Sequence, residues 1–317
     1  MKIKHLLCFI ALCLFFTPGK AQQLSVMTLR NGATVYIWED KSKPDVFGMI
    51  AFKVGSVDDP EQYTGLAHYL EHVMFKGTQT IDALDWEKEK PIYEKIIAKY
   101  DERAALSDPA AREAVDKEIN DLTREAAQYA AGNEFSLLVD HMGGQGLNAS
   151  TGYDQTEYHN SFPPSQLEKW LEIYSERLID PVFRGFQTEL EAVYEEYNMY
   201  NDDRGSRMRE FIYEQAFGDH PYARPIIGLP EHLKNPQLSK LIDFYNTWYG
   251  PQNMSIILVG NIDAKEAIPM IRDKFERVPR RAEIHREKKP VRQFKGRTEK
   301  SAKIFYYPIL ALIYNGV

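Results

Sequence analysis

The chain has 317 residues, a formal net charge of −7 at pH 7 and 44% hydrophobic residues. This acidic balance argues against nucleic acid as a partner and mildly favours neutral or basic peptides. The two cysteines, Cys8 and Cys13, both lie near the amino end. The chain after them therefore has no disulfide and no thiol chemistry.

Residues 1–21 have the pattern of a secretory signal peptide. Two basic residues, Lys2 and Lys4, precede an apolar run over 6–16, and the small residue Ala21 ends the segment. The run is too short to span a bilayer comfortably, and no other stretch approaches about 18 apolar residues. We therefore expect an exported chain, periplasmic or secreted, without a membrane span.

The next part of the chain favours strands and then helices. Residues 25–38 predict a hairpin whose turn is Asn31-Gly32, a strong hairpin signal, and residues 45–54 predict a further strand. Residues 80–135 are charged and rich in alanine, and they predict two helical segments separated at Asp108-Pro109. This stretch could be a lid or exosite, but its pattern favours a peripheral, solvated helical hairpin.

The carboxyl-terminal part predicts three amphipathic helices, a buried strand and one more helix, at 165–178, 188–200, 236–249, 254–259 and 264–275. Because strands and helices do not alternate regularly, we expect an α+β fold with a mixed or antiparallel sheet packed against helices. The predicted domain covers 24–276. Acidic residues among the lysines and arginines of 277–300 favour a solvated linker over a nucleic-acid or membrane patch, and 301–317 resembles the start of a second domain.

His68, Glu71 and His72 are the most informative residues of the chain. On a helix, residues four apart are separated by about 40° around the axis, so His68 and His72 can hold one metal ion. Glu71 lies one step off that line, where it could act as a general base on a zinc-bound water. The apolar residues around the motif imply a buried helix, which argues against a chance pattern on a surface helix.

A catalytic zinc site needs three protein ligands, so one ligand is missing from this motif. The best candidate segment is the helix predicted over 188–200, with Thr188 and Glu191 as its capping box. Helical geometry places Glu196 on the less polar face and Glu195 on the polar face. We therefore predict Glu196 as the third ligand.

Glu189 stands seven residues before Glu196 and nearly eclipses it on a helix. It could support the site by orienting a histidine or a water. It could also simply be an acid in the first helical turn, where the helix dipole favours one. The two effects are compatible at one residue.

These segments resemble the pitrilysin or insulinase-like zinc metallopeptidases, a family that includes the mitochondrial processing peptidases. Order and spacing agree, apart from one insertion, over 65–78, 143–144, 147–151, 189–196, 220–222, 227–228, 249–255 and 259–263. The resemblance implies a zinc-dependent endopeptidase with one Zn²⁺ per chain. It implies that His68, His72 and Glu196 bind the metal, that Glu71 activates water, and that Glu189 matches the acid the family places before its distal ligand.

Residues 147–151 resemble the strand that this family places at the sheet edge beside the metal. An extended peptide can add to such an edge through main-chain hydrogen bonds, so Asn148 and Ala149 are candidate substrate-binding residues. The alternative is an ordinary strand bounded by glycine, in which the asparagine only ends a turn.

Members of this family consist of two related halves that close around the substrate, and this chain corresponds to the first half. A partner subunit or second half-domain is therefore expected. The alternative function is a non-catalytic or truncated subunit that binds peptides and needs a second half for activity. The presence of Glu71 argues for catalysis, and a purely structural zinc site is disfavoured because such sites usually have four protein ligands.

Overall fold

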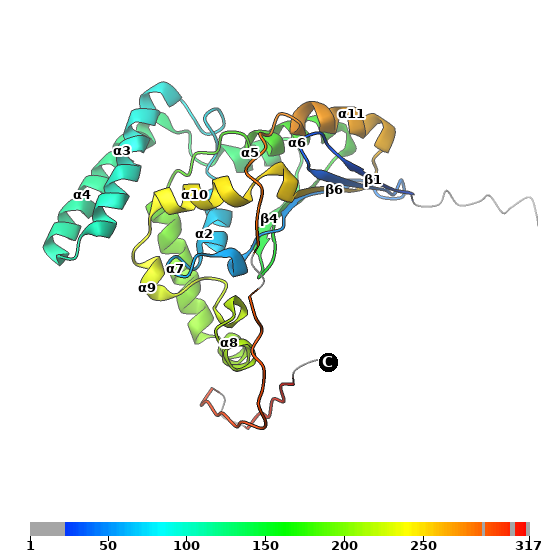
Figure 1. Ribbon diagram of the computed structural model, residues 1–317. Helices are drawn as coiled ribbons and strands as arrows, with labels where there is room; N and C mark the ends of the chain where they lie inside the picture. Colours follow the sequence, from blue (N-terminus) through cyan, green and yellow to red (C-terminus); the bar gives the residue numbers. More distant parts are fainter. Residues whose placement is uncertain (1–22, 287–288, 305–307, 315–317) are drawn as a thin grey trace, which may run out of the picture.

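The computed structural model describes residues 23–286, 289–304 and 308–314 (Figure 1). The predicted signal peptide lies outside these residues. A six-stranded mixed sheet has the order β1-β2-β6-β3-β5-β4. The strands are β1 (Gln23–Thr28), β2 (Thr34–Glu39), β3 (Val46–Phe52), β4 (Gln145–Thr151), β5 (Thr156–Phe162) and β6 (Met254–Gly260). Only the β2–β6 pair is parallel, which confirms the predicted α+β class with a mixed sheet.

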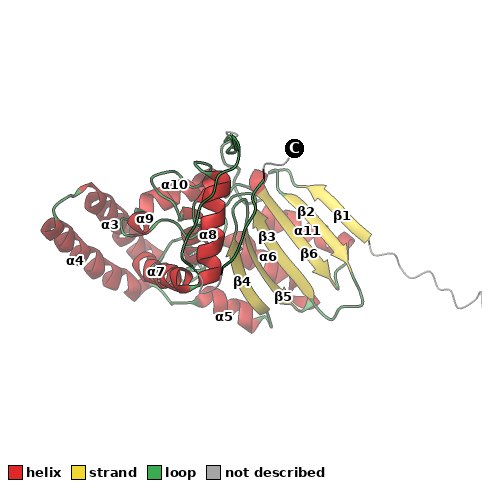
Figure 2. Ribbon diagram, turned by 90° about the horizontal axis from the view of Figure 1, so that it is seen from below, coloured by secondary structure: helices red, strands yellow, loops and turns green. Residues whose placement is uncertain are grey.

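Two helices cover one face of the sheet, α6 (Leu167–Glu176) and α11 (Ala264–Phe275), and Figure 2 shows them behind the strands. Alternate strand residues point toward this face and are buried, as the period of two in a strand requires. Trp170 of α6 stacks on Phe162 at a centroid distance of 5.2 Å. A Cβ atom at Gly48 would meet the Trp170 ring at 2.5 Å, so β3 needs glycine there.

Most of the other helices gather at the β4 end of the sheet (Figure 1). They are α2 (Leu66–Val73), α5 (Glu134–His141), α7 (Phe186–Asp202), α8 (Arg204–Phe217), α9 (Pro230–Leu233) and α10 (Leu238–Trp248). The helix α2 lies between α7 and α10 and also contacts β4. None of the helices in the described ranges is long and apolar enough to cross a membrane.

The predicted helical hairpin is present as α3 (Trp86–Ala105) and α4 (Pro109–Ala126). Asp108 caps α4 by accepting a hydrogen bond from the Ala111 amide, and Pro109 takes the first helical position as predicted. The hairpin projects from the molecule in Figure 1. The base of α3 is nevertheless buried, since Glu89, Ile92 and Ile96 are each less than 9% exposed.

One sequence interpretation of the helices was wrong, and one helix was not predicted. Thr188 does not cap α7, because the helix begins at Phe186 with Gly185 as its N-cap in a left-handed conformation (φ 62°). The reason is tertiary: Phe186 is buried against the rings of Tyr69 and Tyr100, each at 4.8 Å. The helix α8 was not predicted, although Met208, Phe211 and Ile212 recur at the spacing of a helix.

Candidate metal centre and cleft

The amino end of α2 is fixed by a buried carboxylate. Asp59 accepts hydrogen bonds from the Gly65 amide (2.7 Å) and the Ala67 amide (2.9 Å), which satisfies two donors that the first helical turn leaves free. Gly65 adopts φ 90°, and a Cβ atom there would meet the Ile227 carbonyl oxygen at 2.6 Å. This close approach to the chain at 227–228 sets the position of α2.

The start of α7 is held against the same helix. The Tyr69 hydroxyl, which is buried on α2, donates a hydrogen bond to the Phe186 carbonyl oxygen. The face of α7 that carries Glu189, Val193 and Glu196 therefore turns toward α2, while Glu195 is exposed. This arrangement agrees with the helical geometry that separated the two adjacent acids in the sequence.

Three side chains converge where α2 and α7 meet. The His68 Nε2 atom lies 3.4 Å from Glu196 Oε2, and the His72 Nε2 atom lies 3.7 Å from Glu196 Oε1. One ligand atom from each residue lies within 4.8 Å of the others. Two ligands bound tetrahedrally at about 2.1 Å are separated by about 3.4 Å, so this donor set fits zinc in both chemistry and spacing.

Burial holds His68 in the neutral form that a metal ligand requires. Burial, with a second contribution from His72, lowers the pKa of His68 to about 3. Burial also acts to lower the pKa of His72, but the carboxylates of Glu189, Glu196 and Glu71 outweigh it and raise that pKa. A bound cation would replace the proton that these carboxylates favour.

Glu189 lies behind His72. Its Oε2 atom is 3.5 Å from His72 Nδ1, and its Oε1 atom is 2.5 Å from the Lys76 Nζ atom. Burial raises the pKa of Glu189, but the hydrogen bonds from His72 and Lys76 outweigh it and lower the pKa. The two nitrogens of His72 thus face different groups, Nδ1 toward Glu189 and Nε2 toward Glu196.

Glu71 is buried beside the three converging side chains. The Thr151 hydroxyl at the end of β4 donates a hydrogen bond of 2.5 Å to its Oε2 atom. Burial raises the pKa of Glu71, although the Thr151 hydrogen bond opposes this effect. A carboxylate with a raised pKa is suited to accept and return a proton near neutral pH.

A cleft with a volume of about 670 Å³ opens over these residues. The edge strand β4 forms one wall of the cleft, and both Asn148 and Ala149 line it. Their strand neighbours in β5 are His159 and Tyr158, so the other edge of β4 faces away from the sheet. Among the described strands none pairs with that edge.

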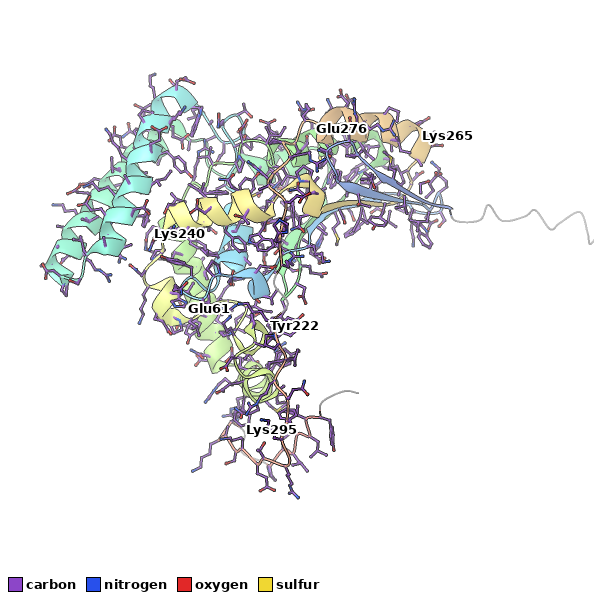
Figure 3. All side chains as sticks on the ribbon, in the orientation of Figure 1. Glu61, Tyr222, Lys240, Lys265, Glu276 and Lys295 are labelled. Carbon is purple, nitrogen blue, oxygen red and sulfur yellow. The ribbon has the colours of Figure 1, made fainter. Side chains whose placement is uncertain are left out.

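The cleft is also lined by residues that sequence reasoning missed, Ser206, Arg209, Glu210 and Tyr213 of α8. The Tyr213 ring stacks on Tyr153 at 5.5 Å, and Tyr222, labelled in Figure 3, contacts Tyr153 at 5.1 Å. Asp203, which caps α8 by accepting from the Ser206 amide, is a sequence signal that could have located this helix.

The family model of insulinase (peptidase family M16) matches residues 34–90 and 122–229. These ranges cover more than half of the chain and contain all the converging residues. The chain belongs to peptidase family M16. A second model, the M16 inactive domain, matches 237–312. Residues 91–121, which the first model skips, lie within the helical hairpin α3–α4.

Curated M16 relatives include zinc proteases. The chain is 25% identical over 270 residues to the probable zinc protease PqqL of Escherichia coli, covering 81% of this chain and 23% of PqqL. It is 24% identical to the zinc protease PqqE of Helicobacter pylori, covering 79% of this chain and 46% of PqqE. Zinc is the metal of the family, in agreement with the sequence prediction.

Solved structures support the same fold. The first half of the periplasmic protease PqqL from Escherichia coli aligns with a TM-score of 0.64 at 25% identity, covering 86% of this chain and 50% of that one. Pitrilysin aligns with a TM-score of 0.63 at 22% identity, covering 86% and 25%. The M16 chain described here thus spans half or less of the length of these relatives.

Proposed function

We propose that this M16 chain is the metal-binding half of a zinc-dependent endopeptidase that cleaves peptides or unfolded polypeptides. The observation that carries the proposal is the convergence of His68, His72 and Glu196 next to the buried carboxylate of Glu71. These four groups lie in one cleft beside an unpaired strand edge. Three of them would bind the metal, and Glu71 would transfer the proton.

The two histidines and Glu196 would hold one zinc ion, and Glu189 would orient His72 through its Nδ1 atom. When bound, zinc lowers the pKa of a water molecule and polarises the scissile carbonyl group. Glu71 would take a proton from the attacking water and deliver it to the leaving amine. The Thr151 hydroxyl fixes the Glu71 carboxylate for this transfer.

The substrate would bind as an added strand along β4, next to Asn148 and Ala149. Main-chain hydrogen bonds to a strand edge require an extended peptide and make few demands on its sequence. A folded protein would have to expose such a segment first. This supports short peptides and unfolded polypeptides as substrates.

A second half is part of the proposal, because the chain covers only 50% of the structure of the first half of PqqL and spans less than half of its curated relatives. A partner half would close the cleft opposite β4. The signal pattern at 1–21 supports export to the periplasm or beyond, and the similar PqqL is described as periplasmic. A chain that binds peptide without cutting it is the alternative.

The test is hydrolysis of a quenched fluorescent peptide by the purified mature chain, with and without a chelator, compared with Glu71→Gln. We expect chelator-sensitive cleavage that Glu71→Gln lowers by about 10²–10⁴-fold without loss of zinc. If the chain binds zinc but does not cleave the peptide, and a supplied second half restores cleavage, the chain is a subunit that depends on a second half for activity. Cleavage that survives both the chelator and Glu71→Gln would refute the proposal.

A further inference from the structure

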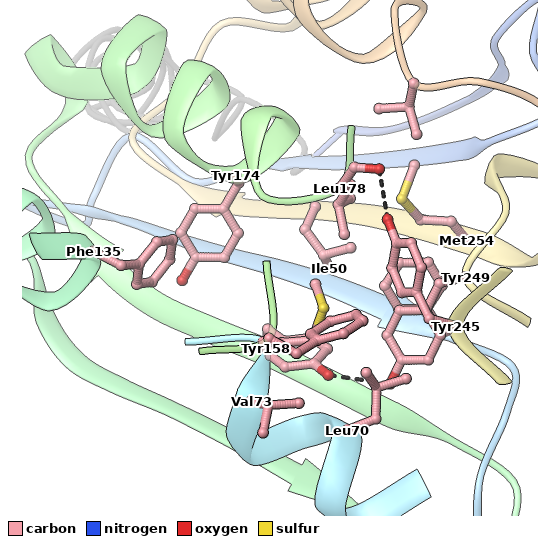
Figure 4. Packing of buried hydrophobic residues seen from close by; sticks show 14 of the residues in the cluster. Ile50, Leu70, Val73, Phe135, Tyr158, Tyr174, Leu178, Tyr245, Tyr249 and Met254 are labelled. Carbon is pink, nitrogen blue, oxygen red and sulfur yellow. Dashed lines mark hydrogen bonds between the residues drawn. The ribbon is translucent and has the colours of Figure 1, made fainter. Parts of the chain in front are cut away.

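Arg177 is a fully buried cation behind α2, the helix that carries His68 and His72 and is called the metal helix below. It follows α6, is 2% exposed, and its guanidinium lies over four rings, those of Phe75 (4.8 Å), Phe135 (4.4 Å), Tyr158 (4.5 Å) and Tyr174 (5.5 Å). Figure 4 shows Phe135, Tyr158 and Tyr174 near one another in this part of the core. Within the described residues no carboxylate forms an ion pair with Arg177.

Such a position is costly for a charge. Taking a cation out of water costs several kcal/mol, and an apolar residue of similar size is often more stable in a core. The ring faces compensate part of this cost through cation–π attraction. The Arg177 Nε and Nη1 atoms have no hydrogen-bond partner among the described residues. Core packing alone therefore does not explain an arginine here.

The one hydrogen bond of Arg177 points to a role. Its Nη2 atom donates to the Met74 carbonyl oxygen at 3.0 Å, and Met74 is the residue that ends α2. A cation at the carboxyl end of a helix also interacts favourably with the helix dipole. The helix α2 has only eight residues, a length that is marginal without tertiary contacts.

The four rings around Arg177 form an aromatic cage, and Phe75 connects this cage to the cleft. This residue follows Met74, its ring lies over the guanidinium, and it lines the cleft three residues after His72. The other rings come from α5, β5 and α6. One cation thus joins the end of the metal helix to three elements of the core.

We propose that Arg177 is a positioning residue that fixes the carboxyl end of α2 and thereby holds His72 for zinc. The proposal rests on the proposed zinc site. Removing the charge frees the last turn of α2, lets Phe75 move, and lowers the affinity for zinc. It does so by loosening a helix end, without removing any ligand.

The experiment compares Arg177→Met, Arg177→Lys and the control Ile271→Ala, which creates a cavity under α11 far from the cleft. Zinc affinity is measured by competition with a chromophoric chelator. Hydrogen exchange of the metal-free chain is followed at amides 72–78. We expect Arg177→Met to weaken zinc binding by about tenfold or more, with faster exchange at 72–78, and Arg177→Lys to restore part of both.

Ile271→Ala should lower the melting temperature and leave both readouts as in the wild type. If Arg177→Met and Ile271→Ala lower the melting temperature alike and neither changes zinc affinity or local exchange, Arg177 is only a core residue and the proposal is wrong. If the wild-type chain binds no zinc, the proposed function fails, while exchange at 72–78 still decides whether Arg177 holds α2.

If Arg177→Met does not fold, two variants with smaller changes test the same proposal. Phe135→Leu removes one ring from the cage, and Phe275→Leu makes the same change under α11. We expect Phe135→Leu to weaken zinc binding by about threefold or more, and Phe275→Leu to leave it unchanged. Equal zinc affinities of the two variants would overturn the proposal.

Discussion

At the scale of single residues, His72 uses its two ring nitrogens for different purposes. Nε2 faces Glu196 at the proposed metal position, whereas Nδ1 faces Glu189, and Glu189 is itself held by Lys76. A carboxylate on the second nitrogen fixes the tautomer and the ring orientation of a ligating histidine. Glu189 should therefore matter for zinc affinity although it is not one of the three proposed ligands.

The first prediction concerns Glu189→Gln, which keeps the shape of the side chain and removes its charge. We expect zinc affinity to fall by about 10–100-fold, because His72 loses its orienting carboxylate. Zinc affinity is measured by competition with a chelator. Glu191→Gln, on the exposed face of the same helix, is the control and should bind zinc like the wild type. Equal affinities of the two variants would refute this role.

At the scale of secondary-structure elements, α2 depends on the buried carboxylate of Asp59 at its amino end. Burial raises the pKa of Asp59 to about 7, although the amides of Ala67 and Gly65 and the charge of Arg224 oppose this effect. The unfolded chain has a pKa near 3.8 for this group. The folded chain therefore binds more protons between these values, and stability falls as pH rises through this range.

The second prediction follows from this loss of stability with rising pH. Without metal, the free energy of unfolding of the wild type should fall between pH 5 and pH 8 by about 1 kcal/mol or more beyond the change in Asp59→Asn. Urea denaturation of both proteins at the two pH values measures it. Parallel pH dependence in the two proteins would show that Asp59 titrates in the folded chain as it does in the unfolded one.

A second element-scale feature links the helical hairpin to the metal helix. Arg184, which precedes α7, donates to both carboxylate oxygens of Glu89 on α3, at 2.6 and 2.7 Å. It also donates to the carbonyl oxygens of Lys76 and Thr78 just after α2. Glu89 is 1% exposed, so this ion pair is buried. The base of α3 is thus part of the core.

The third prediction is that Glu89→Gln destabilises the chain by about 3 kcal/mol, because it leaves the buried Arg184 without its counter-ion. Glu118→Gln removes a carboxylate from the exposed pair with Lys99 on the same hairpin, and it should cost less than about 1 kcal/mol. Urea denaturation compares the two. A similar small effect of both substitutions would mean that the hairpin is peripheral throughout.

At the scale of the whole molecule, the sequence predicted the class of fold and most elements because their signals are local. The Asn31-Gly32 turn, the cap at Asp108 and the spacing of His68 and His72 depend on neighbouring residues only. The start of α7 at Phe186 did not follow from the sequence, because contacts with two distant rings decide it.

The candidate site also has features that the local sequence predicts and features that only the fold reveals. Helical spacing was enough to prefer Glu196 over Glu195, since both belong to one helix. The contacts of Thr151 with Glu71 and of Lys76 with Glu189 join separate elements, so only the fold reveals them. The part of the cleft that α8 lines was also missed, although Met208, Phe211 and Ile212 recur at the spacing of a helix.

The central claim is that the fold brings α2 and α7 together to form one zinc site. The most direct measurement is the zinc content per chain, by elemental analysis, of the wild type, Glu196→Ala and Glu195→Ala. We predict one zinc in the wild type and in Glu195→Ala, whose side chain is exposed, and a loss of zinc in Glu196→Ala. Equal zinc in both variants, or none in the wild type, would contradict the account.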